Sequence, residues 1–143
     1  MFIAIKEKKK LINELNKALG WELRAQALYA HYGAYLKGLE AISWKSHFGK
    51  EAEESVGHAG KVRDMIALVG GEAVTTRDAA PILHTEDLKT MLTEARKTET
   101  AAAKQYQKVL PLVRVHPVLT HTILHILMDE IQAAEELEAM LGG

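Results

Sequence analysis

Glutamate and histidine side chains interrupt the apolar pattern of this chain at four places. In three stretches apolar residues recur every three or four positions, and Glu22, Glu99 and Glu130 replace one of them; in a fourth stretch the interruption is His58. A buried carboxylate without a partner costs several kcal/mol, so it must be protonated, paired or bound to a cation. No Lys or Arg occurs on the same stripes. Carboxylates with imidazole suit iron or manganese, and the pattern therefore predicts a metal site.

The alternative is that one or two of these side chains lie at the edge of their apolar stripe and reach water. Exposure to water explains one glutamate in an apolar stripe as well as metal binding does. It explains four interruptions together less well, so the metal site is the favoured interpretation.

Long helices are the elements that would carry these side chains. Prolines occur only at positions 81, 111 and 117. Apolar spacing of three and four predicts helices over about 8–38, 41–70, 86–113 and 117–141. The stripe of the second helix is expected to include Ile42, with Gly70 and Gly71 ending that helix. Thr85 is the expected N-cap of the third helix, and Pro117 suits the first turn of the fourth.

The connections between these helices predict how they pack. The first two helices, and the last two, are joined by only a few residues and should be antiparallel neighbours. The segment between Gly71 and His84 is long enough to cross a bundle of helices that are each about 40–46 Å long. We therefore expect a single all-α domain over 1–143, an antiparallel four-helix bundle with one long crossover.

The composition limits the class of protein. The chain has 143 residues, 48% of them apolar and 26% charged, with a formal net charge of −1. Cysteine is absent, which excludes disulfides and thiolate ligands. Neither a membrane span nor a secretory signal is expected, so a cytoplasmic protein is predicted. The balanced charge makes nucleic acid an unlikely partner.

Four stretches resemble the ferritin-like superfamily, and in particular its bacterioferritin-type members. They are LNKALGWELRAQALY, which ends at Tyr29, HAGKVRDMIALVGGEAV (58–74), EARKTETAAAKQY (94–106) and HPVLTHTILHILMDE (116–130). The resemblance extends over nearly the whole chain. It implies a homo-oligomer that binds iron, with manganese as a possible substitute, and that oxidises Fe(II) with oxygen or peroxide.

The resemblance also implies roles for individual residues. Glu22 and Glu130 match terminal carboxylate ligands, Glu99 matches a bridging carboxylate, and His58 matches the histidine of the second helix. Tyr29 matches the tyrosine that supports the site. Val56 occupies the position of the methionine that binds haem in haem-carrying members, so no haem is expected.

Two ligand positions depart from the family pattern of Glu-x-x-His on the second and fourth helices. Ser55 stands three residues before His58, and Ala133 stands three residues after Glu130. Glu54 is the candidate replacement for the missing carboxylate, since residues four apart on a helix can share one ion, and a one-residue π-bulge would bring it closer. Glu51 lies on the same face of the predicted helix as His58, but it is about 10.5 Å along the axis from His58, which is too far to share one ion.

Two other functions remain open from the sequence. The chain could be a degenerate ferritin-like scaffold that acts through assembly, with its inner carboxylates protonated or hydrogen-bonded. It could also be a DNA-protecting mini-ferritin, with Lys6 to Lys10 as the basic arm. His121, His125 and Asp129 form a line on the last helix, and helical angles predict that they face away from Glu130.

Overall fold

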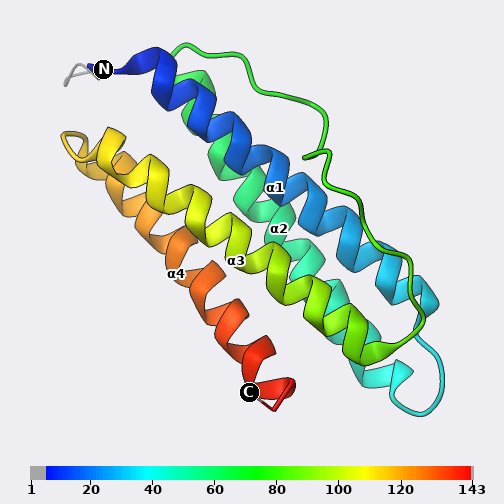
Figure 1. The fold of residues 1–143 in the computed structure, drawn as a ribbon. Coiled ribbons are helices and arrows are strands. Elements are labelled where there is room, and N and C mark those ends of the chain that lie inside the picture. Colours follow the sequence, from blue (N-terminus) through cyan, green and yellow to red (C-terminus); the bar gives the residue numbers. More distant parts are fainter. Residues whose placement is uncertain (1–5, 143) are drawn as a thin grey trace.

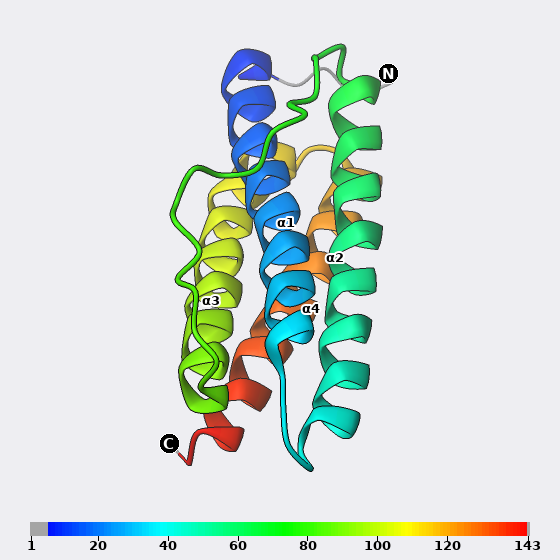
Figure 2. The ribbon, with the colours of Figure 1, turned by 90° about the vertical axis from the view of Figure 1, so that its right-hand side faces the viewer.

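Residues 6–142 are described by the computed structural model, and they form four long helices (Figure 1). These are α1 (Lys8–Tyr35), α2 (Ala41–Leu68), α3 (Leu88–Val113) and α4 (Pro117–Met140). The described residues contain no strand. α1 packs along α2, and α3 packs along α4, while the segment between α2 and α3 runs the length of the bundle (Figure 2). The predicted four-helix bundle with one long crossover is confirmed.

The helix ends differ from the predicted ones for local reasons. α1 ends at Tyr35 because Leu36 is extended, and Gly38 then adopts a φ of 81° in the left-handed region. α2 ends at Leu68, and Gly70 follows with a φ of 83°. The expectation that Ile42 joins the core was wrong, because this side chain is 85% exposed near the start of α2.

Side-chain caps fix the beginnings of α3 and α4. Asp87 caps α3 in place of the expected Thr85, since its carboxylate accepts a hydrogen bond from the Thr90 amide at 3.0 Å. Thr85 instead accepts one from the Asp87 amide. Pro117 lies in the first turn of α4, as predicted.

The crossover is fastened to α1 and α3 by polar side chains. Asn16 accepts a hydrogen bond from the Val74 amide at 2.8 Å. Arg24 is buried because its guanidinium donates to the carbonyls of Ala80 and Pro81 and to the Thr98 hydroxyl. These bonds satisfy a charged group that the core could not otherwise hold, and they keep the crossover against the bundle.

A polar layer divides the apolar core into two parts. On each helix the residues of one apolar cluster lie to one side of the layer, and those of the other cluster lie to the other side. On α1, for example, Leu15 and Leu19 belong to the first cluster, and Leu28 and Tyr32 to the second. Glu22 lies between them. The equivalent gaps on the other helices hold His58, Glu99 and Glu130.

Candidate metal centre

Each of the four helices contributes one ionisable side chain to the polar layer. These side chains are almost completely buried, with exposures of 1% for Glu22, 4% for His58, and 3% each for Glu99 and Glu130. Within residues 6–142, no Lys or Arg forms an ion pair with any of them; their ion pairs are with one another and with carboxylates. The alternative that these glutamates reach water is therefore excluded.

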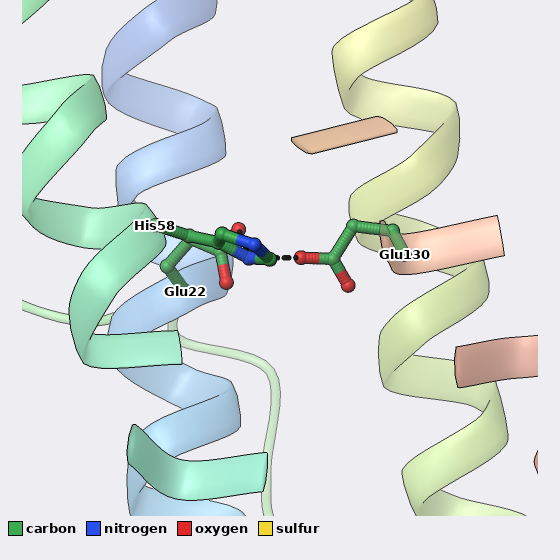
Figure 3. Close-up of side chains that lie close together, drawn as sticks. All are labelled: Glu22, His58 and Glu130. Carbon is green, nitrogen blue, oxygen red and sulfur yellow. Dashed lines mark hydrogen bonds and ion pairs between the residues drawn. The ribbon is translucent and has the colours of Figure 1, made fainter. Parts of the chain in front are cut away.

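His58 lies at the centre of the group. Its Nδ1 atom is 3.0 Å from Glu130 Oε1 and 3.4 Å from Glu22 Oε2. Figure 3 shows the His58 ring beside Glu22, with both side chains facing Glu130. One ligand atom from each of these residues lies within 4.8 Å of the other two. A single ion can thus contact all three side chains after small adjustments.

Two tyrosines hold the carboxylates of the opposite helix. Tyr29 on α1 donates a hydrogen bond to Glu99 Oε1 at 2.8 Å, and Tyr106 on α3 donates one to Glu22 Oε2 at 2.6 Å. Each tyrosine follows the glutamate of its own helix by seven residues, so the two bonds form a reciprocal pair. The sequence pattern indicated a role in the site for Tyr29 but none for Tyr106. The repeated Glu-to-Tyr spacing was the signal that could have identified it.

The protonation of the layer reflects the absence of a compensating cation. Burial raises the pKa of Glu130 well above its usual value, and the hydrogen bond and negative charge of Glu99 raise it further. Burial also raises the pKa of Glu99, although its hydrogen bonds with Glu130 and Tyr29 oppose this. Glu130 thus interacts with both Glu99 and His58.

Burial would lower the pKa of His58, but its carboxylate neighbours have a larger effect. The hydrogen bond and charge of Glu22, followed by the hydrogen bond of Asp129, raise the pKa of His58 to about 9. In the metal-free protein at neutral pH, the imidazole is therefore positively charged, and its two N–H groups donate to carboxylates on both sides of the ring.

The outer side of the His58 ring faces a small acidic pocket. Nε2 is 2.9 Å from Asp129 Oδ2 and 3.7 Å from Glu54 Oε1. Asp129 lies on the opposite side of the ring from Glu130, in line with the prediction that it faces away from Glu130, but its contact with His58 was not predicted. The pocket has a volume of about 120 Å³, and its lining residues are Glu51, Glu54, Asp129, Gln132, Ala133 and Glu136.

Neither of the two substituted positions, Ser55 and Ala133, offers a free metal ligand. Ser55 is buried, but its hydroxyl donates to the Glu51 carbonyl at 3.0 Å along its own helix. Ala133 is also buried and forms part of the pocket wall. α2 is an unbroken α-helix across these residues, without the π-bulge considered from the sequence. Glu54 consequently meets His58 from the outer side, apart from Glu22 and Glu130.

Glu51 is half-buried in the same pocket wall. Burial and the nearby charges of Glu99, Glu54 and Glu136 raise its pKa to about 7. Among the described residues, Glu51 belongs to neither of the two groups around His58 whose ligand atoms lie within 4.8 Å of one another.

The sequence of this four-helix bundle matches a known protein family. The model of the ferritin-like domain matches residues 12–143. The chain belongs to the ferritin-like domain family. The resemblance inferred from the sequence is thereby confirmed.

Solved ferritin-like structures share the fold over nearly the whole chain. A ferritin-like, diiron-carboxylate protein from Bacillus anthracis is 28% identical, with a TM-score of 0.89 over 95% of this chain and 98% of that one. A bacterioferritin-related protein from Bacteroides fragilis, described as a dodecameric thioferritin, is 23% identical, with a TM-score of 0.86 over 95% of this chain and 86% of that one. No curated protein matches the chain.

The donor set of this ferritin-like bundle fits iron. Three buried carboxylates and one imidazole nitrogen are the hard and intermediate ligands that iron and manganese accept. The raised pKa values of Glu99 and Glu130 also fit, because burial first, and the neighbouring carboxylates second, disfavour the charged forms, and a bound cation would offset both effects.

Proposed function

We propose that this ferritin-like protein binds iron in its polar layer and catalyses the oxidation of Fe(II) by oxygen or peroxide. The observation that carries the proposal is the convergence of Glu22, His58 and Glu130, buried and from three different helices, with ligand atoms within 4.8 Å of one another. The B. anthracis relative, described as a diiron-carboxylate protein, supports the same chemistry.

The residues of the polar layer would form one metal position with a complete set of ligands and a second position with an incomplete set. Glu22, His58 Nδ1 and Glu130 would hold the first ion. Glu99, with Glu130 shared, would hold a second ion more weakly, because Ser55 and Ala133 supply no ligand there. Glu54 would contribute a carboxylate on the outer side of the ring, where it also lines the acidic pocket.

Fe(II) is the substrate in this reaction, and each ion gives up one electron, so two ions reduce one peroxide to water with two protons. The protein holds the ligand side chains in position and accepts or releases protons at them. Asp129 accepts the Nε2–H of His58 and so keeps Nδ1 directed inward. Tyr29 and Tyr106 hold Glu99 and Glu22 in place. The protons on His58 Nδ1 and Glu130 must leave when a cation binds.

The experiment is aerobic addition of Fe(II) to metal-free protein, followed by near-ultraviolet absorbance. Oxidation should be faster than in buffer alone and should fall to the buffer rate in His58→Gln and Glu130→Gln. Glu53→Gln is the matched control, since Glu53 lies on α2 but is exposed. Oxidation at the buffer rate by the wild-type protein would rule out the catalytic part of the proposal.

A specific observation favours a second candidate, a ferritin-like scaffold without catalytic activity. Every fully buried side-chain nitrogen and oxygen among the described residues has a hydrogen-bond partner without any metal. If Glu22→Ala combined with Glu99→Ala makes the protein more stable and the wild type retains no iron, the scaffold is the correct description.

We also propose that the chain forms a homo-oligomer in the cytoplasm. Leu39, Ile42, Val118 and Met128 are more than half exposed, which is costly unless sister subunits cover them. The B. fragilis relative is described as dodecameric. Light scattering after gel filtration would give the mass, and a monomer would contradict the proposal. Within residues 6–142, no helix is long and apolar enough to cross a bilayer.

DNA binding is the least supported of the functions considered. Lys8, Lys9 and Lys10 are exposed at the start of α1, as solvated lysines on a helix usually are. A gel shift at physiological salt should show no retarded DNA, and a salt-resistant complex would revive the mini-ferritin hypothesis.

A further inference from the structure

A second group of metal-ligating side chains lies where the crossover reaches the end of α1. His31 on α1 and His84 at the end of the crossover approach each other, with 3.0 Å between His31 Nε2 and His84 Nδ1. His31 is nine residues beyond Glu22, which is about 13.5 Å along the helix from the polar layer. The pair is therefore separate from the candidate iron centre.

Neighbouring contacts hold both rings in position. The Tyr35 ring packs edge-on against His84 at 4.5 Å between centroids and tilted against His31 at 4.9 Å. On either side of His84, the Leu83 carbonyl accepts the Tyr32 hydroxyl at 2.7 Å, and Glu86 pairs with Lys37 at 3.0 Å. The crossover is thus already fixed here, so the two imidazoles need little ordering to act together.

The distance between the two nitrogens suits chelation. Bonds of about 2.0–2.1 Å to two neighbouring corners of a tetragonal ion place the donor atoms about 2.9 Å apart. In the metal-free pair, one ring donates its N–H to the other. If that ring moves its proton to its remote nitrogen and both rings turn slightly, both facing nitrogens offer lone pairs without net proton loss. The pair is exposed, so water can complete the coordination.

We propose that His31 and His84 form a surface chelate for a tetragonal divalent ion of the late first row, Cu²⁺ or Ni²⁺. Two imidazoles without a carboxylate favour these ions over Fe²⁺. Occupancy would join residues 53 positions apart in the sequence and would secure the end of the crossover to α1. The proposal is independent of iron chemistry in the polar layer.

Calorimetric titration of the full chain with Ni²⁺ tests the proposal. The titration uses a His58→Gln/Glu130→Gln background, which removes the polar-layer ligands His58 and Glu130; the expected result there is one ion per chain whose affinity falls at least ten-fold when His84→Ala or His31→Ala is added. Affinity should be retained when His121→Ala/His125→Ala, the other histidine pair, is added to the same background. His84→Gln repeats the test with a polar side chain, and circular dichroism confirms that each variant is folded.

A second readout locates the ion. Ni²⁺ should slow amide hydrogen exchange over residues 82–87 in the wild type and leave it unchanged in His84→Ala. The proposal is overturned if adding His84→Ala to the His58→Gln/Glu130→Gln background leaves Ni²⁺ binding unchanged, if binding disappears with His121→Ala/His125→Ala instead, or if the background variant binds no Ni²⁺ at all.

Discussion

The stability of the metal-free protein should fall as the pH rises from 6.5 to 9, because of His58. Its carboxylate neighbours raise the pKa from 6.5 to about 9 in the folded state. A group whose pKa is raised by folding stabilises the native state fully below its unfolded pKa, and this contribution disappears as the pH passes its folded pKa. At about 1.36 kcal/mol per pKa unit, the difference corresponds to about 3 kcal/mol.

Glu51 acts in the same direction but in a lower pH range. Its pKa rises from 4.5 to about 7 on folding, so its ionisation destabilises the native state progressively over that interval. Because this side chain is only partly buried, solvent screening reduces the effect to about 1–2 kcal/mol. Above pH 7 its contribution changes little. The raised pKa values of Glu99 and Glu130 act in the same direction, so the part of the further decline that His58→Gln removes is the part that reports His58.

The assay is urea denaturation of EDTA-treated protein followed by circular dichroism, at one protein concentration and at pH 6, 7, 8 and 9. The wild type should lose about 3 kcal/mol of unfolding free energy across this range, and His58→Gln should show a much smaller decline. His125→Gln, an exposed histidine on α4, is the control and should follow the wild type. A wild-type stability that is constant or rising between pH 6.5 and 9 would refute the reasoning, as would an equal decline in His58→Gln.

Three substitutions test other parts of the site. Tyr106→Phe removes the hydrogen bond to Glu22 and should cost about 1.5–3 kcal/mol in urea denaturation, and an unchanged midpoint would contradict that role. Asp129→Ala removes the acceptor of the His58 Nε2–H, so it should lower Fe(II) affinity roughly 10–100-fold in anaerobic titration while leaving the helical content unchanged. Ala133→His restores a ligand to the incomplete position and should raise the iron bound per chain from one ion to two, whereas an unchanged stoichiometry would count against that position.

The fold could be predicted because periodicity is a local property of helices. Spacing of three and four identified all four helices, and the long segment before His84 identified the crossover. Helix ends were less predictable, since they depend on individual caps. Asp87 rather than Thr85 caps α3 because its carboxylate, three residues before Thr90, reaches that amide.

The buried members of the site were predictable for a related reason. Glu22, His58, Glu99 and Glu130 interrupt apolar stripes, so their inward direction follows from the helix alone. A helical angle gives the direction of a side chain but not its reach or the position of the facing helix. The contact that Asp129 makes from α4 with the Nε2 of His58 was therefore missed.

Arg24 shows a further limit of sequence reasoning. Its burial depends on carbonyls of the crossover, at Ala80 and Pro81, whose location no periodicity indicates. Long-range polar partners of this kind become visible only once the chain is folded.

The most direct test of iron binding in the polar layer is anaerobic equilibrium titration of metal-free protein with Fe(II). The wild type and Glu53→Gln should each bind at least one ion per chain tightly, and His58→Gln combined with Glu130→Gln should bind none above background. Absence of iron binding by the wild type, or equal binding by the double variant, would show that Glu22, His58 and Glu130 do not form a metal site.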